Sequence, residues 1–445
     1  MMHPKTHASL LVLGIAGLLT VTGQAYASGY QISEQSVAGL GRAFAGGTLP
    51  NDDVSAVFYN PADMMLSKGM QAQAGFTFIG TELKAENAGT TNRLPANLSD
   101  VISKPGTLPV FVTIPDRGYS DDGGTDNVVP NTFFAMDIND QMRFGFGITA
   151  PFAVYSSYGK NWVGRYSAVN SEMKTIDLNP GIAYRVNDQL SLGFGVSVQY
   201  IDVDLSKSLF TGGPDGYSEV KGDDWGFGFN LGATYEFDPT TRVGLSYRSR
   251  VEHDLEGDAE ISGAGARSGK YDVTADWTAP DWAALAFYKR LNDQWAIMAS
   301  TRWTNWSTYD KLQIDLASTG TPLTVVEQKW EDSWSFNLGV SYDYNPDWTF
   351  RAGYVFDQSP VQDEYRNPSI PDSDRNAIAL GFSYRPMANL SVDFGYMHIW
   401  FKSASTDEVL DLTAAAGFPG LATQHLLLDY DNSADIVGLQ ASYKF

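Results

Sequence analysis

Hydrophobic and polar residues alternate along most of the chain after residue 68. From Trp225 to Phe237, aromatic and aliphatic residues take every second position, and Gly, Asn, Thr and Glu lie between them. Successive side chains of a strand point to opposite faces, so this pattern predicts strands with one apolar and one polar face. The same alternation covers 190–200, 243–251, 295–303, 334–342, 348–356, 378–384 and 390–396.

The length of these runs separates two kinds of β-protein. A soluble β-sandwich would also alternate, but its strands average about 5–6 residues, and 225–237 is much longer. Long strands with aromatic residues near their ends are typical of outer-membrane barrels. The last strand fits as well, because Val437, Leu439, Ala441, Tyr443 and Phe445 share one face. A terminal strand that ends in an aromatic residue resembles the signal by which such barrels are recognised for insertion.

Turns and loops give a strand count. Short polar turns occur at 139–141, 187–189, 238–240, 292–294, 345–347 and 386–389. Longer polar or glycine-rich segments lie between them, near 85–128, 153–169, 206–220, 258–275, 317–324, 358–372 and 403–423. Short turns alternating with long loops are the outer-membrane pattern. Six turns and seven loops predict an all-β fold, a fourteen-stranded antiparallel transmembrane β-barrel over 68–445, which is closed because lipid cannot satisfy strand edges.

The N-terminal residues predict export. Lys5, an apolar run from Leu10 to Leu19 and the small residues Ala25 and Ala27 form a signal peptide over 1–27, so the mature chain is expected to begin at Ser28. The protein is then placed in the outer membrane of a Gram-negative bacterium.

Residues 28–67 follow neither the period of 2 residues of a strand nor the period of 3.6 residues of an α-helix. The segment is rich in glycine between Gly39 and Gly46, yet it contains Leu40, Phe44 and Phe58. A disordered arm is one interpretation, but disordered segments are usually poor in such residues. We therefore expect an N-terminal hatch, or plug, inside the lumen.

Composition excludes several functions. A net charge of −22 disfavours nucleic acid as a partner, and it suits a barrel whose charges lie in loops and lumen. The histidines of the mature chain, His253, His398 and His425, form no metal-spaced pair and adjoin no nucleophile. Acidic residues in the first long loop are expected to be solvated rather than metal-binding. No enzyme activity, cofactor or metal site is expected.

Short motifs along the mature chain resemble the FadL family of outer-membrane transporters for long-chain fatty acids and other hydrophobic compounds. They occur in order at 28–31, 39–43, 60–62, 225–228, 247–249, 306–307, 357–361 and 370–375. The resemblance implies a fourteen-stranded barrel with an N-terminal hatch. It also implies that hydrophobic molecules leave through a lateral opening beside an inward kink in the third strand.

The sequence suggests where this kink lies. Phe144, Phe146 and Ile148 alternate regularly, and Pro151 then cannot donate a ladder hydrogen bond. We expect the kink between Gly147 and Pro151. The alternative is that the strand ends there and its loop begins.

The resemblance implies further site residues. Lys207 and Lys329 fall where the family has basic residues for the ligand carboxylate; at the first position the family type member has arginine, and lysine keeps its charge but not its bidentate geometry. Both could instead be solvated lysines at the base of loops. Gly41, Arg42, Asn60, Pro61 and Ala62 belong to the hatch and its gating, and Asn60 and Pro61 would face the third-strand kink.

Two charged residues of this set predict contacts between hatch and barrel. Arg42 is expected to anchor the hatch to wall carboxylates such as Glu236 or Asp393. Arg375 falls on the lumen face, where it forms either an ion pair tied to the hatch or a salt bridge at the rim; we expect a structural role.

The sequence leaves four functions to compare. The first is passive diffusion of long-chain fatty acids through a plugged barrel with a lateral opening, and the second is uptake of aromatic hydrocarbons or other small hydrophobic molecules. Lys207 and Lys329 favour the first, because a neutral hydrocarbon needs no cation. An outer-membrane lipase lacks an evident Ser–His group, and the hatch disfavours a porin. The expected partners are the hydrophobic ligand, outer-membrane lipid and lipopolysaccharide, and the protein is expected to be monomeric.

Overall fold

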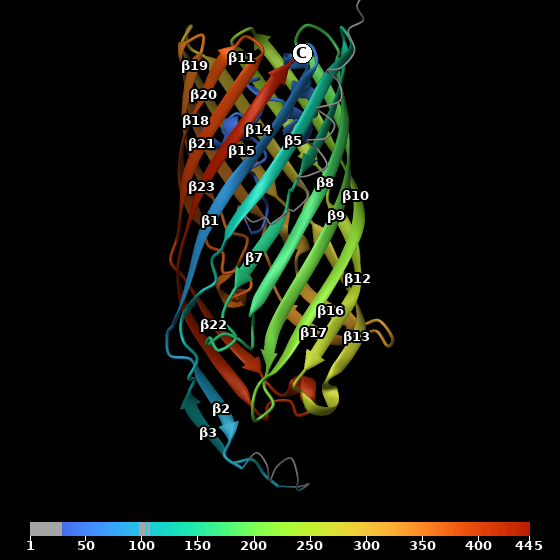
Figure 1. Ribbon diagram of the computed structural model, residues 1–445, viewed down its shortest axis with the longest axis vertical. Coiled ribbons are helices and arrows are strands. Elements are labelled where there is room, and N and C mark those ends of the chain that lie inside the picture. The colour runs from blue at the N-terminus through green and yellow to red at the C-terminus, as the bar shows by residue number, and fades with distance from the viewer. Residues whose placement is uncertain (1–28, 98–103, 105–106) are drawn as a thin grey trace, which may run out of the picture.

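The described residues form one closed antiparallel barrel of fourteen strands, as the turns and loops predict. The structure is a computed structural model that describes residues 29–97, 104 and 107–445. The predicted signal peptide, residues 1–27, lies outside the described residues. The barrel is tall, and its strands are tilted against its long axis (Figure 1).

Several barrel strands are split into two segments. The wall consists, in order, of β1 (Gln71–Asn87), β4 (Asp121–Asp122) with β5 (Asp126–Asn139), β6 (Met142–Thr149) with β7 (Ala153–Ser157), β8 (Asn170–Arg185), β9 (Leu190–Leu209), β10 (Gly216–Asp238), β11 (Thr241–Arg248) with β12 (Val251–Ser262), β13 (Gly269–Ala279) with β14 (Trp282–Arg290), β15 (Trp295–Thr304) with β16 (Lys311–Leu316), β17 (Thr321–Glu327) with β18 (Ser333–Asn345), β19 (Trp348–Asp357), β20 (Arg375–Met387), β21 (Leu390–Phe401) with β22 (Ala404–Asp411), and β23 (Thr423–Lys444).

The first and last strands close the barrel. β1 pairs with β23 along its whole length, from Gln71 opposite Lys444 to Asn87 opposite Leu428. The backbone N–H of Phe445 donates to the carbonyl of Met70 at 2.9 Å, so the last residue completes this seam. The seam leaves no open edge, which a lipid environment requires.

The apolar face of the strands points outward. In 225–237, the aromatic side chains Trp225, Phe227 and Phe229 are exposed, and Phe227 keeps 71% of its surface. Apolar exposure on this scale fits contact with lipid. None of the described helices is long and apolar enough to cross a membrane.

Alternation reverses at the end of the barrel that is remote from the C-terminus. In β12, the apolar Val251 and Leu255 are buried toward the lumen, whereas Glu252, Asp254 and Glu256 are exposed outside. The long loops that we predicted at 206–220 and 258–275 are consequently shorter. Polar outward residues continue the strands β9, β10, β12 and β13 beyond the lipid-facing band.

Residues 29–67, which we call the hatch segment, lie inside the barrel (Figure 1). The segment contains the short helices α1 (Val37–Leu40) and α2 (Ala56–Tyr59) and the 3₁₀ helix η1 (Pro61–Leu66). Ser36 caps α1 by accepting from the N–H of Gly39, and Asn60 caps η1 by accepting from the N–H of Ala62. Most of its residues are buried.

Elements outside the wall are short. A hairpin of β2 (Thr91–Pro95) and β3 (Phe111–Pro115) extends past the barrel rim at the end remote from the C-terminus (Figure 1). The remaining 3₁₀ helices are η2 (Gly265–Arg267), η3 (Trp306–Thr308), η4 (Asp363–Tyr365) and η5 (Ala414–Ala416).

Candidate functional site

A largely apolar cavity of about 150 Å³ lies in the half of the barrel that is remote from the C-terminus. We call it the inner cavity. Its wall is built from the inward-facing residues of the strands in which alternation is reversed. Its apolar lining includes Val154, Met173, Val203, Leu205, Val220, Leu255, Val273, Leu312, Ile314, Val326 and Ile370.

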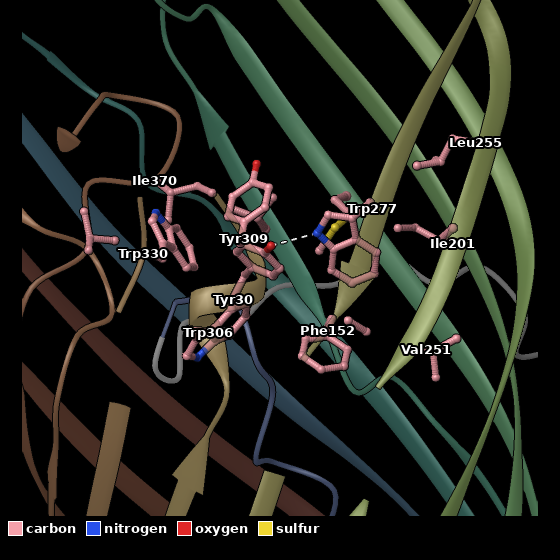
Figure 2. Close-up of a cluster of buried hydrophobic side chains, with 14 of the residues drawn as sticks. Tyr30, Phe152, Ile201, Val251, Leu255, Trp277, Trp306, Tyr309, Trp330 and Ile370 are labelled. Atoms are coloured by element: carbon pink, nitrogen blue, oxygen red, sulfur yellow. Dashed lines mark hydrogen bonds between the residues drawn. The ribbon is translucent and has the colours of Figure 1, made fainter. Parts of the chain in front are cut away.

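A group of aromatic side chains closes the inner cavity on the hatch side. Tyr30 of the hatch segment lies at its centre, with ring centroids 4.7 Å from Trp306 and 5.2 Å from Trp330 (Figure 2). The indole Nε1–H of Trp277 donates to the hydroxyl of Tyr30 at 2.8 Å. Burial raises the pKa of Tyr30, so its hydroxyl stays neutral. The first residues of the hatch segment therefore form part of the cavity floor.

Lys207 lies at the opposite, polar end. It lines the inner cavity and also a second, larger cavity of about 650 Å³, which we call the outer cavity. Ser218, Thr324 and Val326 line both cavities too. Lys207 thus lies at a neck where the two cavities adjoin, at the mouth of a largely apolar chamber.

Lys329 lies elsewhere. The lining of the inner cavity includes its neighbour Gln328 but not Lys329. Its ammonium contacts the carboxylates of Asp310 at 2.8 Å and Glu327 at 3.1 Å, and the hydrogen bond that it donates to Asp310 contributes most to raising its pKa to about 12. The structure therefore does not bring the two predicted lysines together in one cavity. The position of Lys329 fits the alternative interpretation, a solvated lysine at the base of a loop.

The barrel wall is interrupted between its second and third strands. β5 and β6 pair from Asn139 to Thr132, which lies opposite Ile148. Beyond this pair β5 continues along β1, whereas the third strand turns inward at 150–152. The strands meet again where the N–H of Ser157 donates to the carbonyl of Gly123. Among the described residues, the ladder between these two strands is thus broken from the Thr132–Ile148 pair to the Gly123–Ser157 contact. We call this stretch the wall gap.

The inward turn pairs with the hatch instead of with β5. The N–H of Ile32 donates to the carbonyl of Pro151 at 2.8 Å, and that of Ala153 donates to Tyr30 at 3.0 Å. The side-chain amide of Gln35 donates to the carbonyl of Ala150 at 2.7 Å. The backbone groups that the wall gap frees are therefore satisfied by the hatch segment.

The two residues predicted for the kink have different positions. Pro151 lies in the inward turn, but Gly147 lies in regular ladder opposite Phe133 and Asn179. A Cβ on Gly147 would lie 2.9 Å from the ring of Phe133 and 3.2 Å from Val57 of the hatch. Gly147 thus provides space for packing, and the kink begins later than predicted.

Hatch residues fit closely against the lumen wall. A Cβ on Gly232 of β10 would lie 2.0 Å from the Oδ1 of Asn60, and one on Gly193 of β9 would lie 2.3 Å from the backbone nitrogen of Ala62. Pro61 lies between these contacts. Asn60 and Pro61 therefore contact the fifth and sixth strands, whereas the wall gap contacts Tyr30 to Gln35. The implied position of Asn60 and Pro61 beside the kink differs from this arrangement.

The predicted partners of Arg42 are wrong. Its guanidinium lies 2.8 Å from Asp52, within the hatch, rather than beside Glu236 or Asp393. Asp52 in turn lies 3.0 Å from Arg351 on β19, and Arg351 lies 3.7 Å from Asp393. Burial opposes ionisation of Asp52, but the two guanidiniums lower its pKa. Anchoring thus runs through Asp52 and Arg351. Next to Arg42, Gly41 lies against Gly381 of β20, where a Cβ on Gly41 would be 2.9 Å from the Cα of Gly381.

Arg375 forms a buried group connected to the hatch. Its guanidinium lies 3.2 Å from Asp357 and 3.5 Å from Asp372. Asp372 also accepts from the backbone N–H of Gly29, at 3.0 Å. The expected structural role of Arg375 takes the form of an ion pair tied to the first described residue of the hatch.

A family model described as "Outer membrane protein transport protein (OMPP1/FadL/TodX)" matches residues 18–445. The chain belongs to this family. It is therefore an outer-membrane protein, as the barrel predicts.

Individual relatives agree with this assignment. The long-chain fatty acid transport protein of Escherichia coli O6:H1 is 30% identical over 436 residues, which cover 89% of this chain and 92% of the relative. Outer membrane protein P1 of Haemophilus influenzae is 28% identical, over 99% of this chain and 100% of its own. The crystal structure of a Pseudomonas aeruginosa FadL homologue has a TM-score of 0.82 and 26% identity, and covers 94% of this chain and 100% of its own. The toluene transporter TbuX of Ralstonia pickettii, at 20% identity, a TM-score of 0.61 and coverage of 88% and 94%, shows only a shared fold.

Some residues of the site were not foreseen. Trp277 and Leu255 lie on strand segments whose apolar face points into the lumen and whose polar face points outward. The sequence indicates this reversal, because Glu252, Asp254 and Glu256 occupy every second position of β12. Glu408, which lines the outer cavity beside Lys207, carries no local signal, because β22 and β9 are about 200 residues apart in the chain.

Proposed function

We propose that this protein carries long-chain fatty acids across the outer membrane by passive diffusion. One observation supports this function above the others: Lys207 lines a largely apolar cavity where it adjoins the outer cavity. Lys221 also lines the inner cavity, but its ammonium is paired with Asp204 and Glu219. A fatty acid has the complementary arrangement, with one carboxylate and a long apolar tail. Its tail gains roughly 0.8 kcal/mol per CH₂ by leaving water.

The proposed path begins at the outer cavity and passes the neck at Lys207 into the inner cavity. It then leaves sideways through the wall gap. The last step requires Tyr30 to Gln35 to separate from the inward turn at 150–152, because these hatch residues occupy its backbone hydrogen bonds. Those contacts are few, so a local movement rather than expulsion of the whole hatch suffices.

The hatch segment is proposed to block a direct route along the barrel axis. It contacts the barrel on several sides of the lumen through Asn60, Asp52 and Gly29. A sideways exit delivers the ligand among apolar groups, whereas an axial exit would carry the tail through the polar hatch–barrel interface. Transport without a chemical step is the function expected for such a path, and no enzyme activity is proposed.

Uptake of a neutral aromatic hydrocarbon is the second candidate. The aromatic group around Tyr30 would suit such a molecule, and solved structures of similar fold carry the name of toluene transporters. Lys207 favours the fatty acid, because a hydrocarbon gains nothing from an ammonium that has to be partly desolvated.

Ligand binding to the purified barrel separates the two candidates. Lys207→Met should weaken oleate binding by about tenfold or more, the usual effect of losing a charge-assisted hydrogen bond, and should spare oleyl alcohol. Lys329→Met is the matched comparison. Loss of oleate affinity in that variant alone would assign the headgroup to Lys329, and equal toluene and oleate uptake that is independent of Lys207 would favour the hydrocarbon channel.

A further inference from the structure

We propose that Glu408 is the resident counter-ion of Lys207, and that an anionic headgroup binds at Lys207 together with one proton, which Glu408 takes up from solution. This inference rests on the proposed function, since it requires Lys207 to be the headgroup site. It adds a specificity-determining residue and a proton to that binding step.

The neck between the two cavities brings these groups together. Lys207, on β9, lines both cavities, and Glu408, on β22, lines the outer one. Ser167 lines the inner cavity, and its hydroxyl donates to the Oε2 of Glu408 at 3.3 Å. A headgroup that enters the inner cavity therefore passes between the ammonium and a carboxylate that is already oriented.

The two charges interact without touching. The carboxylate of Glu408 and the ammonium of Lys207 attract each other, and the attraction favours the charged form of both groups. Among the described residues, no carboxylate oxygen lies within 4.0 Å of the Lys207 ammonium nitrogen, the distance within which two charges form an ion pair. The two groups are thus more than 4.0 Å apart, which leaves the ammonium able to donate to a ligand oxygen.

Other charged groups around the outer cavity are engaged or open to solvent. Glu327 lies 3.1 Å from Lys329, and Arg366 lies 2.8 Å from Asp363. Asp411 accepts from the backbone of its own loop at Thr413 and Gly420. The remaining titratable groups of the lining lie outside β22, the strand of Glu408. They are Arg267, Tyr166, Tyr271, Tyr365 and the exposed Glu364. Glu408 is therefore the carboxylate placed to respond to a ligand at Lys207.

The charges at the neck predict that a proton binds together with the anionic ligand. Without ligand, one ammonium faces one carboxylate. An added anionic headgroup makes two anions share one cation in a partly desolvated neck, and mutual repulsion raises the proton affinity of the pair. The balanced step is the binding of one ligand anion and one proton, with no bond broken. At full coupling the apparent dissociation constant rises about tenfold per pH unit.

Calorimetry counts the proton. Binding enthalpies are measured in two buffers of different ionisation enthalpy, first with dodecanoate and then with dodecanesulfonate, which stays charged and cannot carry the proton itself. For the wild type we expect close to one proton taken up per bound ligand with both probes. Glu408→Gln should abolish the uptake with dodecanesulfonate and tighten its binding at alkaline pH.

A neighbouring carboxylate provides the control. Asp407 is the preceding residue on β22, is exposed, and contacts His425 at 2.7 Å outside the neck. Asp407→Asn should keep the proton uptake of the wild type, and circular dichroism establishes that each variant retains its barrel.

Three results overturn the inference. The first is wild-type binding of both probes without proton uptake, and the second is unchanged uptake in Glu408→Gln. The third is binding of dodecanoate but not dodecanesulfonate, which would put the proton on the ligand. Failure of the wild type to bind either probe would instead contradict the proposed function.

Discussion

The guanidinium of Arg351, on β19 of the barrel wall, lies 3.0 Å from the carboxylate of Asp52 in the hatch segment. Asp52 also contacts Arg42, at 2.8 Å, and both arginine side chains are 1% exposed. One hatch carboxylate therefore bridges two buried cations, one from the hatch and one from the wall. The hatch is attached to the barrel at this point by charge, and elsewhere by packing and hydrogen bonds.

Removal of the Asp52 charge should release this part of the hatch. Asp52→Asn leaves two buried guanidiniums without their shared counter-ion, a change that typically costs about 3–5 kcal/mol. We expect faster hydrogen exchange in residues 37–53 and larger ion conductance in planar bilayers.

An exposed ion pair is the control for this effect. Lys84 and Glu82 on β1 lie 2.6 Å apart with about half of each side chain exposed, and such pairs contribute little to stability. Glu82→Gln should leave hatch exchange and conductance as in the wild type. If Asp52→Asn behaves the same way, Asp52 does not hold the hatch.

A methyl group on the lumen wall should displace the hatch at a second point. In Gly232→Ala, the new Cβ would lie 2.0 Å from Asn60 Oδ1 and 2.9 Å from the backbone nitrogen of Ala62. Overpacking of this kind costs about 1–3 kcal/mol. Hydrogen exchange in 56–66 should accelerate, whereas Gly213→Ala, whose Cβ would meet its nearest atom at 3.9 Å, should have no effect. Equal exchange in both variants would mean that the hatch does not depend on this fit.

Glu34 should make hatch stability depend on pH. Burial raises its pKa from 4.5 to about 7, although Arg375 and Arg302 oppose the shift. The folded hatch therefore favours the protonated form. Its stabilising effect is full below about pH 4.5 and is lost as the pH rises to about 7.

Hydrogen exchange of 30–40, corrected for its intrinsic pH dependence, tests this trend. Protection should fall between pH 5 and 7 in the wild type and fall less in Glu34→Gln. Asp63, whose pKa burial raises to about 6, leaves a smaller dependence in the same direction. Protection that increases with pH would contradict the assignment.

Much of the barrel could be predicted because a period of two reports directly which face of a strand meets lipid. Trp225, Phe227 and Phe229 are exposed as the alternation predicts. The loops at 206–220 and 258–275 were predicted too long, since charged outward residues resemble loop composition although they continue a strand. The reversed alternation of Val251 and Glu252 distinguishes the two cases.

Contacts across the lumen could be predicted only in part. Periodicity places Arg351 on the inward face but does not indicate which hatch residue lies opposite. The partners predicted for Arg42, Glu236 or Asp393, therefore differ from the observed partner Asp52. Resemblance indicated the kink region but not that Tyr30, Ile32 and Gln35 pair with it. Lys207 lines the inner cavity, whereas Lys329 contacts the carboxylates of Asp310 and Glu327.

A disulfide between the hatch and the inward turn provides the most direct test of sideways exit. Gln31 and Phe152 are opposed in an isolated antiparallel bridge, a spacing compatible with disulfide geometry, and the chain has no cysteine of its own. Ala74→Cys with Ala441→Cys, opposed across the β1–β23 seam, is the control pair. Oxidised Gln31→Cys/Phe152→Cys should lose oleate uptake and regain it on reduction, while the control pair transports in both states. Undiminished uptake by the oxidised Gln31→Cys/Phe152→Cys protein would contradict exit through the wall gap.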